Sequence, residues 1–315
     1  MRNFIAASAC VLTASALLVV AGTPTIDGDI TDGTYTVAAA QDTRTQFGNN
    51  FNELNQLFVD SDTDNVYIAI TGNIADDNAF MLWIDTDPTA GPGGVLNTDD
   101  GSCTQGVRPI VQAMASGTQF DDNFDPDWGI NVSVGKFPGQ SDTLLVFAAD
   151  LLDLNTNTPT VLGVGAVDTG NGLLTGSSGV QIALDNSNTA GIVDYDPNNP
   201  APDPNEAPSA TTGIEIAIPK ALIGISTPQD IRVAALITNN VQDTSGPQNC
   251  PDPNDPNTLV GQEAGPCDRF GFSSNQAMPG VGGVGNLGTF TPGGCFRIDF
   301  LNNAPGDQHA LISLP

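Results

Sequence analysis

Apolar and polar residues alternate in short runs along most of the chain. In the sequence NVYIAI, the residues Val66, Ile68 and Ile70 fall on one side and the residues between them on the other. This two-residue period is typical of a β-strand that has one face in a core. Helical spacing is nearly absent, and glycine and proline interrupt the pattern throughout.

The pattern predicts about ten strands and one short helix. The helix is expected at 219–224, where Pro219 begins and Gly224 ends the sequence PKALIG. The expected strands are 56–59, 65–72, 79–85, 130–135, 143–149, 161–167, 180–185, 213–219, 231–238 and 295–301.

Strands that follow one another without helices between them favour an antiparallel sandwich. We therefore predict an all-β fold: an antiparallel, jelly-roll-like β-sandwich with long loop insertions. The insertions lie near 88–128, 186–212 and 242–292, and none of them has the apolar residues for a core of its own. Residues 22–315 are therefore expected to form one domain.

The N-terminus has the features of a secretory signal peptide. Arg2 is followed by a run from Phe4 to Ala21 that is almost wholly apolar or small. We predict a signal peptide over residues 1–21. A retained membrane anchor is the alternative, because the run is about long enough to span a bilayer. No later stretch is as long and apolar, so the mature protein is expected to be secreted or at the cell surface, off the membrane once the signal is removed.

The chain is strongly acidic. It has 36 Asp and Glu residues against 8 Lys and Arg, a formal net charge of −28. Nucleic acids and anionic membranes would be repelled, so neither is expected as a partner. Nearly all the acids are Asp beside Asn, Gly and Pro in predicted turns. Solvated loops are the simple explanation, and calcium ligation is the other.

Four cysteines follow the predicted signal peptide: Cys103, Cys250, Cys267 and Cys295. An even number in an exported chain favours disulfides, and four cysteines allow three connectivities. Metal binding is the weaker interpretation, because no C-x-x-C pair occurs. Cys250 and Cys267 bracket a turn-rich segment with little means of holding itself together. We therefore predict that these two pair, which leaves Cys103 with Cys295.

Several stretches together resemble a known family. In chain order they are IDGDITDGTY, DSDTDNVYIAITGN, NAFMLWIDTD, TTGIEIAIPKALIGI and IRVAALITNN. This series is similar to the DOMON-like β-sandwich domains related to family 9 carbohydrate-binding modules, in the version common in secreted bacterial proteins. The resemblance covers most of residues 24–300 and rests mainly on structural motifs. It implies a sandwich that is often non-catalytic, in which some members bind sugars and others bind haem.

Few residues suit catalysis or haem. His309 is the single histidine, so no histidine cluster for zinc or iron exists, and there is no G-x-S-x-G motif. Nothing singles out a carboxylate pair among so many Asp residues, and we expect no enzyme. Haem would need axial ligands such as Met and His. Met81 alternates within a predicted strand, where core packing is the commoner role, and no haem is expected.

Sugar binding needs exposed aromatic rings beside hydrogen-bonding groups. Trp128 is the first candidate, because it lies in the polar sequence DDNFDPDWGI, where no periodicity requires burial. Capping of the sandwich end is its alternative role. Tyr195, in the acidic sequence VDYDP, is the second candidate. Trp83 lies inside AFMLWID and is expected to be buried.

The acids that precede residue 65 have the spacing of the first ligands of an EF-hand. Starting from Asp60, however, position six is Asn65 where that loop needs glycine, and position twelve is Thr71 where it needs glutamate. We therefore interpret the segment as a turn that leads into a strand.

Calcium can also be bound by residues from separate loops. Asp85 and Asp87, at the end of a predicted strand, form the expected group together with Asp62 or Asp64 from a neighbouring loop.

The sequence thus leads to two functional hypotheses. The first is a secreted, non-catalytic ligand-binding module for a polysaccharide or cell-surface glycan, with calcium as its cofactor. The alternative is a structural or extracellular matrix protein whose sandwich mediates assembly by self-association.

Overall fold

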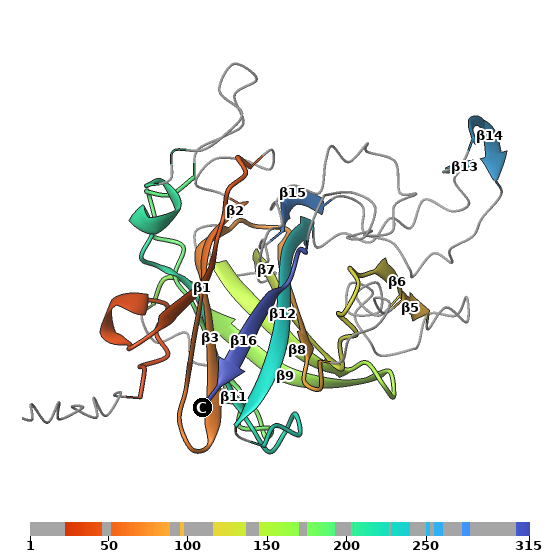
Figure 1. Cartoon of the computed structure of the whole chain (residues 1–315). Helices are drawn as coiled ribbons and strands as arrows, with labels where there is room; N and C mark the ends of the chain where they lie inside the picture. Colours follow the sequence, from red (N-terminus) through yellow and green to blue (C-terminus); the bar gives the residue numbers. More distant parts are fainter. Residues whose placement is uncertain are drawn as a thin grey trace, which may run out of the picture.

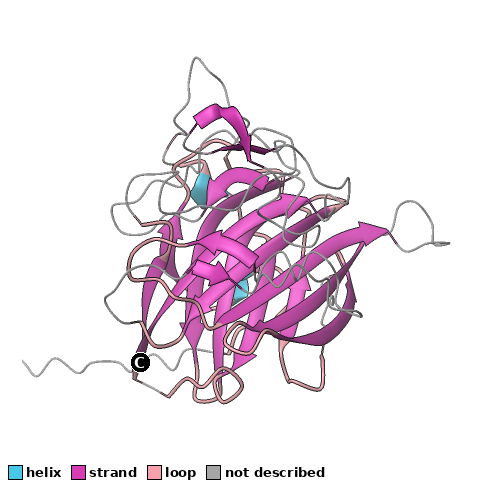
Figure 2. Cartoon of the chain, turned by 90° about the vertical axis from the view of Figure 1, so that its right-hand side faces the viewer, coloured by secondary structure: helices cyan, strands magenta, loops and turns pink. Residues whose placement is uncertain are grey.

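The computed structural model describes most of the predicted strands. The described residues are 23–45, 52–88, 95–97, 116–136, 145–169, 175–192, 203, 205–226, 228–239, 250–252, 255–260, 273–277 and 307–315. Their strands form two large antiparallel sheets packed face to face (Figures 1 and 2). This confirms the predicted all-β sandwich. The signal peptide, the strand expected at 295–301 and Tyr195 lie outside the described residues.

The first sheet has five strands in the order β1-β2-β3-β11-β10. Their bounds are β1 Thr36–Ala40, β2 Asn52–Ser61, β3 Asn65–Ile74, β11 Gly213–Pro219 and β10 Gln181–Leu184.

The second sheet has seven strands. Six follow the order β15-β12-β4-β7-β8-β9, and β16 pairs with β12. Their bounds are β15 Ser273–Ala277, β12 Gln229–Asn239, β4 Asn78–Asp85, β7 Trp128–Lys136, β8 Leu145–Asp153, β9 Thr158–Ala166 and β16 Ala310–Leu314.

Short elements lie within the predicted insertions, where no strands were expected. They comprise two strand pairs, a 3-10 turn and β15 of the second sheet. The pairs are β5 Val95–Asn97 with β6 Ser116–Gln119, and β13 Cys250–Asp252 with β14 Asp255–Val260; the turn is η2 Ala207–Ser209. A further 3-10 turn, η1 Ile30–Asp32, precedes β1.

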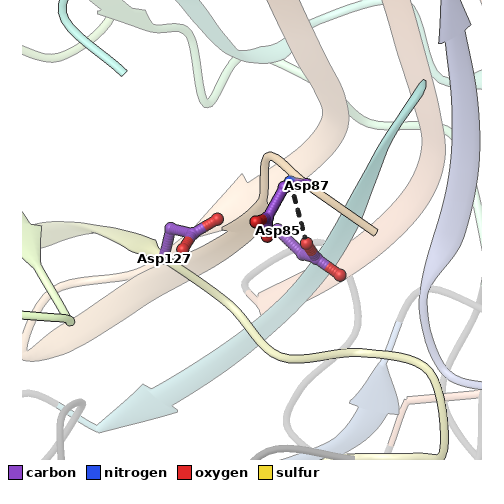
Figure 3. Close-up of side chains that lie close together, drawn as sticks. All are labelled: Asp85, Asp87 and Asp127. Atoms are coloured by element: carbon purple, nitrogen blue, oxygen red, sulfur yellow. Dashed lines mark hydrogen bonds between the residues drawn. The ribbon is translucent and has the colours of Figure 1, made fainter. Parts of the chain in front are cut away.

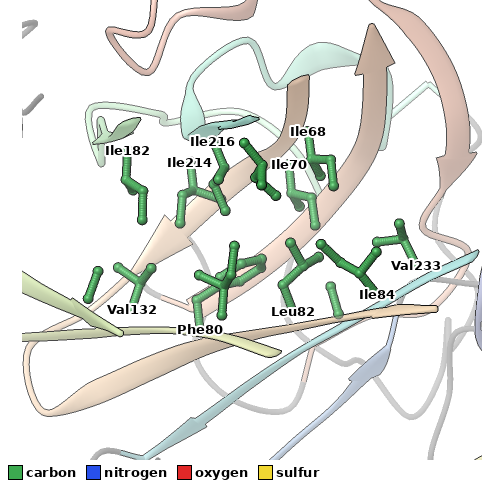
Figure 4. Packing of buried hydrophobic residues seen from close by; sticks show 14 of the residues in the cluster. Ile68, Ile70, Phe80, Leu82, Ile84, Val132, Ile182, Ile214, Ile216 and Val233 are labelled. Carbon is green, nitrogen blue, oxygen red and sulfur yellow. The ribbon is translucent and has the colours of Figure 1, made fainter. Parts of the chain in front are cut away.

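The core lies between the two sheets. Alternation along β3 and β11 directs residues such as Ile68 and Ile214 toward Phe80 and Leu82 of β4 (Figure 4). All of these side chains are at most 2% exposed. Burial of each such side chain stabilises the fold by about 1.5–3 kcal/mol. Among the described residues, no helix is long and apolar enough to cross a membrane.

The outer faces of the sheets are also partly covered. Tyr67 of β3 lies under Ile26 and Tyr35 of the N-terminal segment. On the other sheet, Trp83 packs edge-to-face against Phe120, with ring centroids 5.5 Å apart. Trp83 is fully buried, which confirms the prediction for this residue.

Two local predictions were wrong. Pro219 is the last residue of β11, and residues 220–224 form turns and no helix. The segment closes after one turn: the N–H of Leu222 bonds to the carbonyl of Pro219 and that of Ile225 to the carbonyl of Lys220, both at 2.9 Å, and Gly224 has a φ of 74°. The strands β1 and β16 were not expected. Their sequences, TVAAA and ALISL, contain no polar-apolar contrast strong enough to reveal a strand period.

Candidate functional site

Asp62 lies in the turn between β2 and β3, and its carboxylate is surrounded by donors from this chain. Oδ1 accepts hydrogen bonds from the N–H groups of Asp64 (2.8 Å) and Asn65 (2.7 Å). Oδ2 accepts one from the hydroxyl of Tyr67 (2.6 Å). Although desolvation opposes it, these hydrogen bonds lower the pKa of Asp62.

The same turn is fastened to β11. Lys220, directly after β11, donates its ammonium to the carbonyl of Asp62 and its backbone N–H to the carbonyl of Asp64. The sequence patterns DTDNVY and IPK therefore meet in space. The predicted metal ligands Asp62 and Asp64 hold a turn in place, and the structure does not group them with Asp85 and Asp87.

Asp127 is the aspartate that lies with Asp85 and Asp87. Within the described residues, Asp85, Asp87 and Asp127 each offer one carboxylate oxygen, and these oxygens lie within 4.8 Å of one another (Figure 3). Asp85 is the last residue of β4. Asp127 directly precedes β7, the strand that pairs with β4. The N–H of Asp127 donates to the carbonyl of Ile84 (2.9 Å), which places its side chain beside the end of β4.

Asp85 is buried with few strong donors. It is 2% exposed, and its oxygens accept long hydrogen bonds from the N–H groups of Asp87 (3.2 Å) and Asp125 (3.5 Å). The guanidinium of Arg232 lies 3.7 Å away. Desolvation, with a smaller contribution from the charge of Asp127, raises the pKa of Asp85 to about 6.

Asp127 is held in position by its neighbours. Its Oδ2 accepts from the N–H (2.9 Å) and hydroxyl (2.7 Å) of Thr86, and its Oδ1 accepts from the amide of Asn155 (2.9 Å). Asp125 lies close by, and burial together with the charges of Asp127 and Asp87 raises its pKa. The site therefore contains four carboxylates and the guanidinium of Arg232, a net negative charge that suits a divalent cation with oxygen ligands.

Sequence reasoning did not find Asp127. The pairing of β4 with β7 brings it beside Asp85 although 42 residues separate them in the chain. The available signal was its position directly before a predicted strand, in the acidic sequence DPDW. Without the order of the strands, that signal gives no partner.

Trp128 directly follows Asp127 in the sequence, but its side chain is on the core-facing side of β7. It pairs with Ile84 across the β4–β7 ladder, and its half-buried side chain packs against the main core together with Ile130. This position suits the capping role.

The motifs behind the family resemblance also meet around Glu215 of β11. Its carboxylate accepts from the hydroxyl of Tyr35 (2.8 Å) and from the N–H groups of Asp27 (3.0 Å) and Gly28 (2.7 Å). Gly28 has a φ of 94°, and a Cβ there would lie 2.7 Å from that of Asp185. Burial raises the pKa of Glu215 to about 7. The sequences IDGDITDGTY and EIAIP thus form one structural contact.

The remaining candidates from the sequence are the four cysteines and His309. Cys250 begins β13, but its side chain and the other three cysteines lie outside the described residues, so the disulfides stay a prediction. His309 is 4% exposed and stacks on Phe124 with ring centroids 5.1 Å apart.

Comparison with known proteins gives no relative: no family model matches the chain, and neither curated proteins nor solved structures match it.

Proposed function

We propose that the protein is a secreted, non-catalytic binding module that holds Ca²⁺ at the Asp85–Asp87–Asp127 cluster and binds a polysaccharide or cell-surface glycan at that end of the sandwich. The observation that carries this proposal is the convergence of three carboxylate oxygens within 4.8 Å. Calcium binds oxygens at about 2.3–2.6 Å, so two ligands of one ion lie at most about 5 Å apart.

The burial of Asp85 supports the choice of a cation. A carboxylate that is 2% exposed and accepts only long hydrogen bonds is costly to ionise. A calcium ion would offset this cost and the repulsion from Asp87 and Asp127. Calcium takes six to eight oxygen ligands. Three carboxylates therefore leave coordination positions for water or for the hydroxyl groups of a sugar.

Trp128, half-buried at the start of β7, is the proposed sugar contact. An aromatic ring at the sandwich end can pack on the apolar face of a pyranose while hydroxyl groups bind polar atoms nearby. The sugar class itself is proposed only from the resemblance to carbohydrate-binding modules.

The test measures thermal unfolding and glycan-array binding of the mature protein with calcium, with magnesium at matched ionic strength, and with a chelator. We expect calcium to raise the melting temperature and to be required for glycan binding. Native-state binding stabilises by about 2.7 kcal/mol at a hundredfold excess over Kd. The double variant Asp87→Asn with Asp127→Asn should lose both effects.

Asp230→Asn is the matched control, because Asp230 is an exposed aspartate of β12 outside the cluster. It should keep the calcium shift. Equal shifts with calcium and magnesium, or a calcium shift that survives the double substitution, would remove calcium from the proposal. Failure of the intact protein to bind any polysaccharide would remove the glycan.

A second candidate function is assembly of a structural or matrix layer through the sandwich. The observation that favours it is the exposure of large apolar side chains on edge strands, among them Val161 of β9 at 73%.

A further inference from the structure

The exposed large apolar side chains gather on the lateral edges of the sandwich. Among the described residues they are Val161 and Val164 of β9, 73% and 50% exposed, Val37 of β1 at 49% and Leu311 of β16 at 50%. β9 is the last strand of the seven-stranded sheet on one side. β1 and β16 contact each other on the opposite side. The apolar exposure thus forms two separate edges.

These edge strands contain no charged residue, although the chain has a net charge of −28. Edge strands have unpaired N–H and C=O groups, and charged side chains commonly prevent them from pairing with other chains. β1, β9 and β16 lack that protection. Acidic surfaces of two copies would repel each other, so a second copy is best accommodated where both surfaces are uncharged.

A β-bulge in β9 places Val161 and Val164 on the same outer face, and these two side chains form an apolar ridge. Val161 lies opposite Asp150, and Val164 lies opposite Ala148. The residues of β8 on either side of Ala148 belong to the core, so both valines are on the outer face although they are three residues apart. Leu162, the additional residue, points into the core.

The opposite edge is concave. A groove of about 360 Å³ lies between β1 and β16, lined by Thr36–Ala38, Val59–Ser61 and Leu311–Pro315. Apart from Asp60, its lining side chains are apolar or bear a hydroxyl group. Leu311 is on the outer face of its sheet, because Ala310 and Ile312 on either side of it belong to the core.

We propose that β9 of one copy lies in the β1–β16 groove of a second copy and pairs with the open side of β16. The proposal rests on assembly as the second candidate function, and it names the partner as another copy of this chain. Since β9 and β16 are opposite edges of the same sheet, the contact continues that sheet from molecule to molecule. Val161 and Val164 of one copy then lie on the same outer face as Leu311 of the next.

Such a contact is heterologous, because the two surfaces differ, and it propagates into a filament or a ring. Pro159 has no N–H, so the pairing is expected over Thr160–Ala166. Higher salt should strengthen it, because screening weakens the repulsion between acidic copies.

The experiment measures the molar mass of the mature protein by sedimentation over a range of protein and salt concentrations. Val161→Asp blocks the ridge and Leu311→Asp blocks the groove; both residues are exposed, so both variants should fold. Thr189→Asp adds the same charge at an exposed position outside the edge strands and is the control. We expect the wild type and the control to form species larger than dimers, and each edge variant alone to be monomeric.

Mixing the two edge variants distinguishes the geometry. One intact ridge and one intact groove remain in the mixture, so it should form a one-to-one dimer that grows no further. A Leu311→Asp variant that still dimerises would show that β9 pairs with β9, and a wild type that is monomeric at every concentration and salt would show no contact; either overturns the proposal. Both edge variants should keep the calcium shift, so failure here is separable from failure of the calcium site.

Discussion

Two acidic regions at the ends of strands in this sandwich have similar sequences and opposite electrostatics. In the β2–β3 turn, three donors bond to the carboxylate of Asp62 at 2.6–2.8 Å and lower its pKa. At the end of β4, burial raises the pKa of Asp85 to about 6, and its donors are 3.2 Å and 3.5 Å away. The spacing of acids in the sequence does not separate these cases, whereas the burial of Asp85 and the proximity of Asp87 and Asp127 do.

The difference indicates which region can accept a cation. The donors of Asp62 hold the β2–β3 turn, and among the described residues Asp62 is not grouped with other carboxylates, so this carboxylate contributes to the fold. A buried carboxylate beside two others, as at Asp85, gains from a cation. We therefore expect the turn to determine stability and the cluster to determine the response to calcium.

The largest expected effect concerns Trp128, the residue that follows the cluster. Trp128→Ala should lower the free energy of unfolding by about 3 kcal/mol, near the lower end for aromatic truncation, because the ring is only half-buried. It should also remove glycan binding while the calcium shift persists. Denaturant unfolding and the glycan array measure the two effects. Lost binding at unchanged stability would assign the ring wholly to the ligand, and lost stability with binding retained would assign it wholly to the core.

Asp62→Ala should have the next largest effect. It removes three hydrogen bonds to a charged group, and we expect a loss of about 2 kcal/mol in the free energy of unfolding. The calcium-induced shift in melting temperature should be unchanged. Asp64→Ala is the control, because the Asp64 side chain is exposed and this residue contributes to the turn through its backbone. If Asp62→Ala abolished the calcium shift, the assignment of the two regions would have to be reversed.

Much of the fold could be predicted because aliphatic residues alternate along strands that pack on the main core, as in the run that contains Val66 and Ile68, although the other face of this strand is buried as well. The edges could not be predicted in this way. β1 and β16 are short and uniformly apolar or small, and a strand of this kind shows no period. The helix expected at Pro219 did not form because Gly224, at a φ of 74°, ends the segment after one turn.

The candidate site could be predicted in part. Asp85 and Asp87 are neighbours in sequence at a recognisable strand end, so local reasoning finds them. Asp127 joins them through the register of β4 with β7, which no local pattern reveals. The choice of Asp62 or Asp64 as the third ligand assumed that their loop neighbours the strand end that contains Asp85 and Asp87. It did not take into account that Tyr67 and the turn N–H groups supply donors for the carboxylate of Asp62.

The smallest expected effect is a difference in pH dependence between the two regions. In the absence of calcium, the raised pKa of Asp85 means that the folded state binds a proton more tightly than the unfolded chain, in which the pKa has its ordinary value of 3.8. Its contribution to stability is therefore complete below about pH 4 and is lost as the pH rises through about 6. Asp62, whose pKa is lowered, contributes stability at pH values above its unfolded-state pKa, and this stability is lost as the pH falls.

Asp85→Asn should reduce the decline in stability between pH 4 and pH 6 by on the order of 1 kcal/mol. Asp62→Asn should weaken the loss of stability on acidification. Calcium should reverse the behaviour of the wild type, because binding needs the ionised form of Asp85, and the calcium shift should diminish below about pH 6. Urea unfolding at a series of pH values with and without calcium measures all three. A calcium shift that stays constant from pH 7 to pH 4 would show that Asp85 is not a ligand.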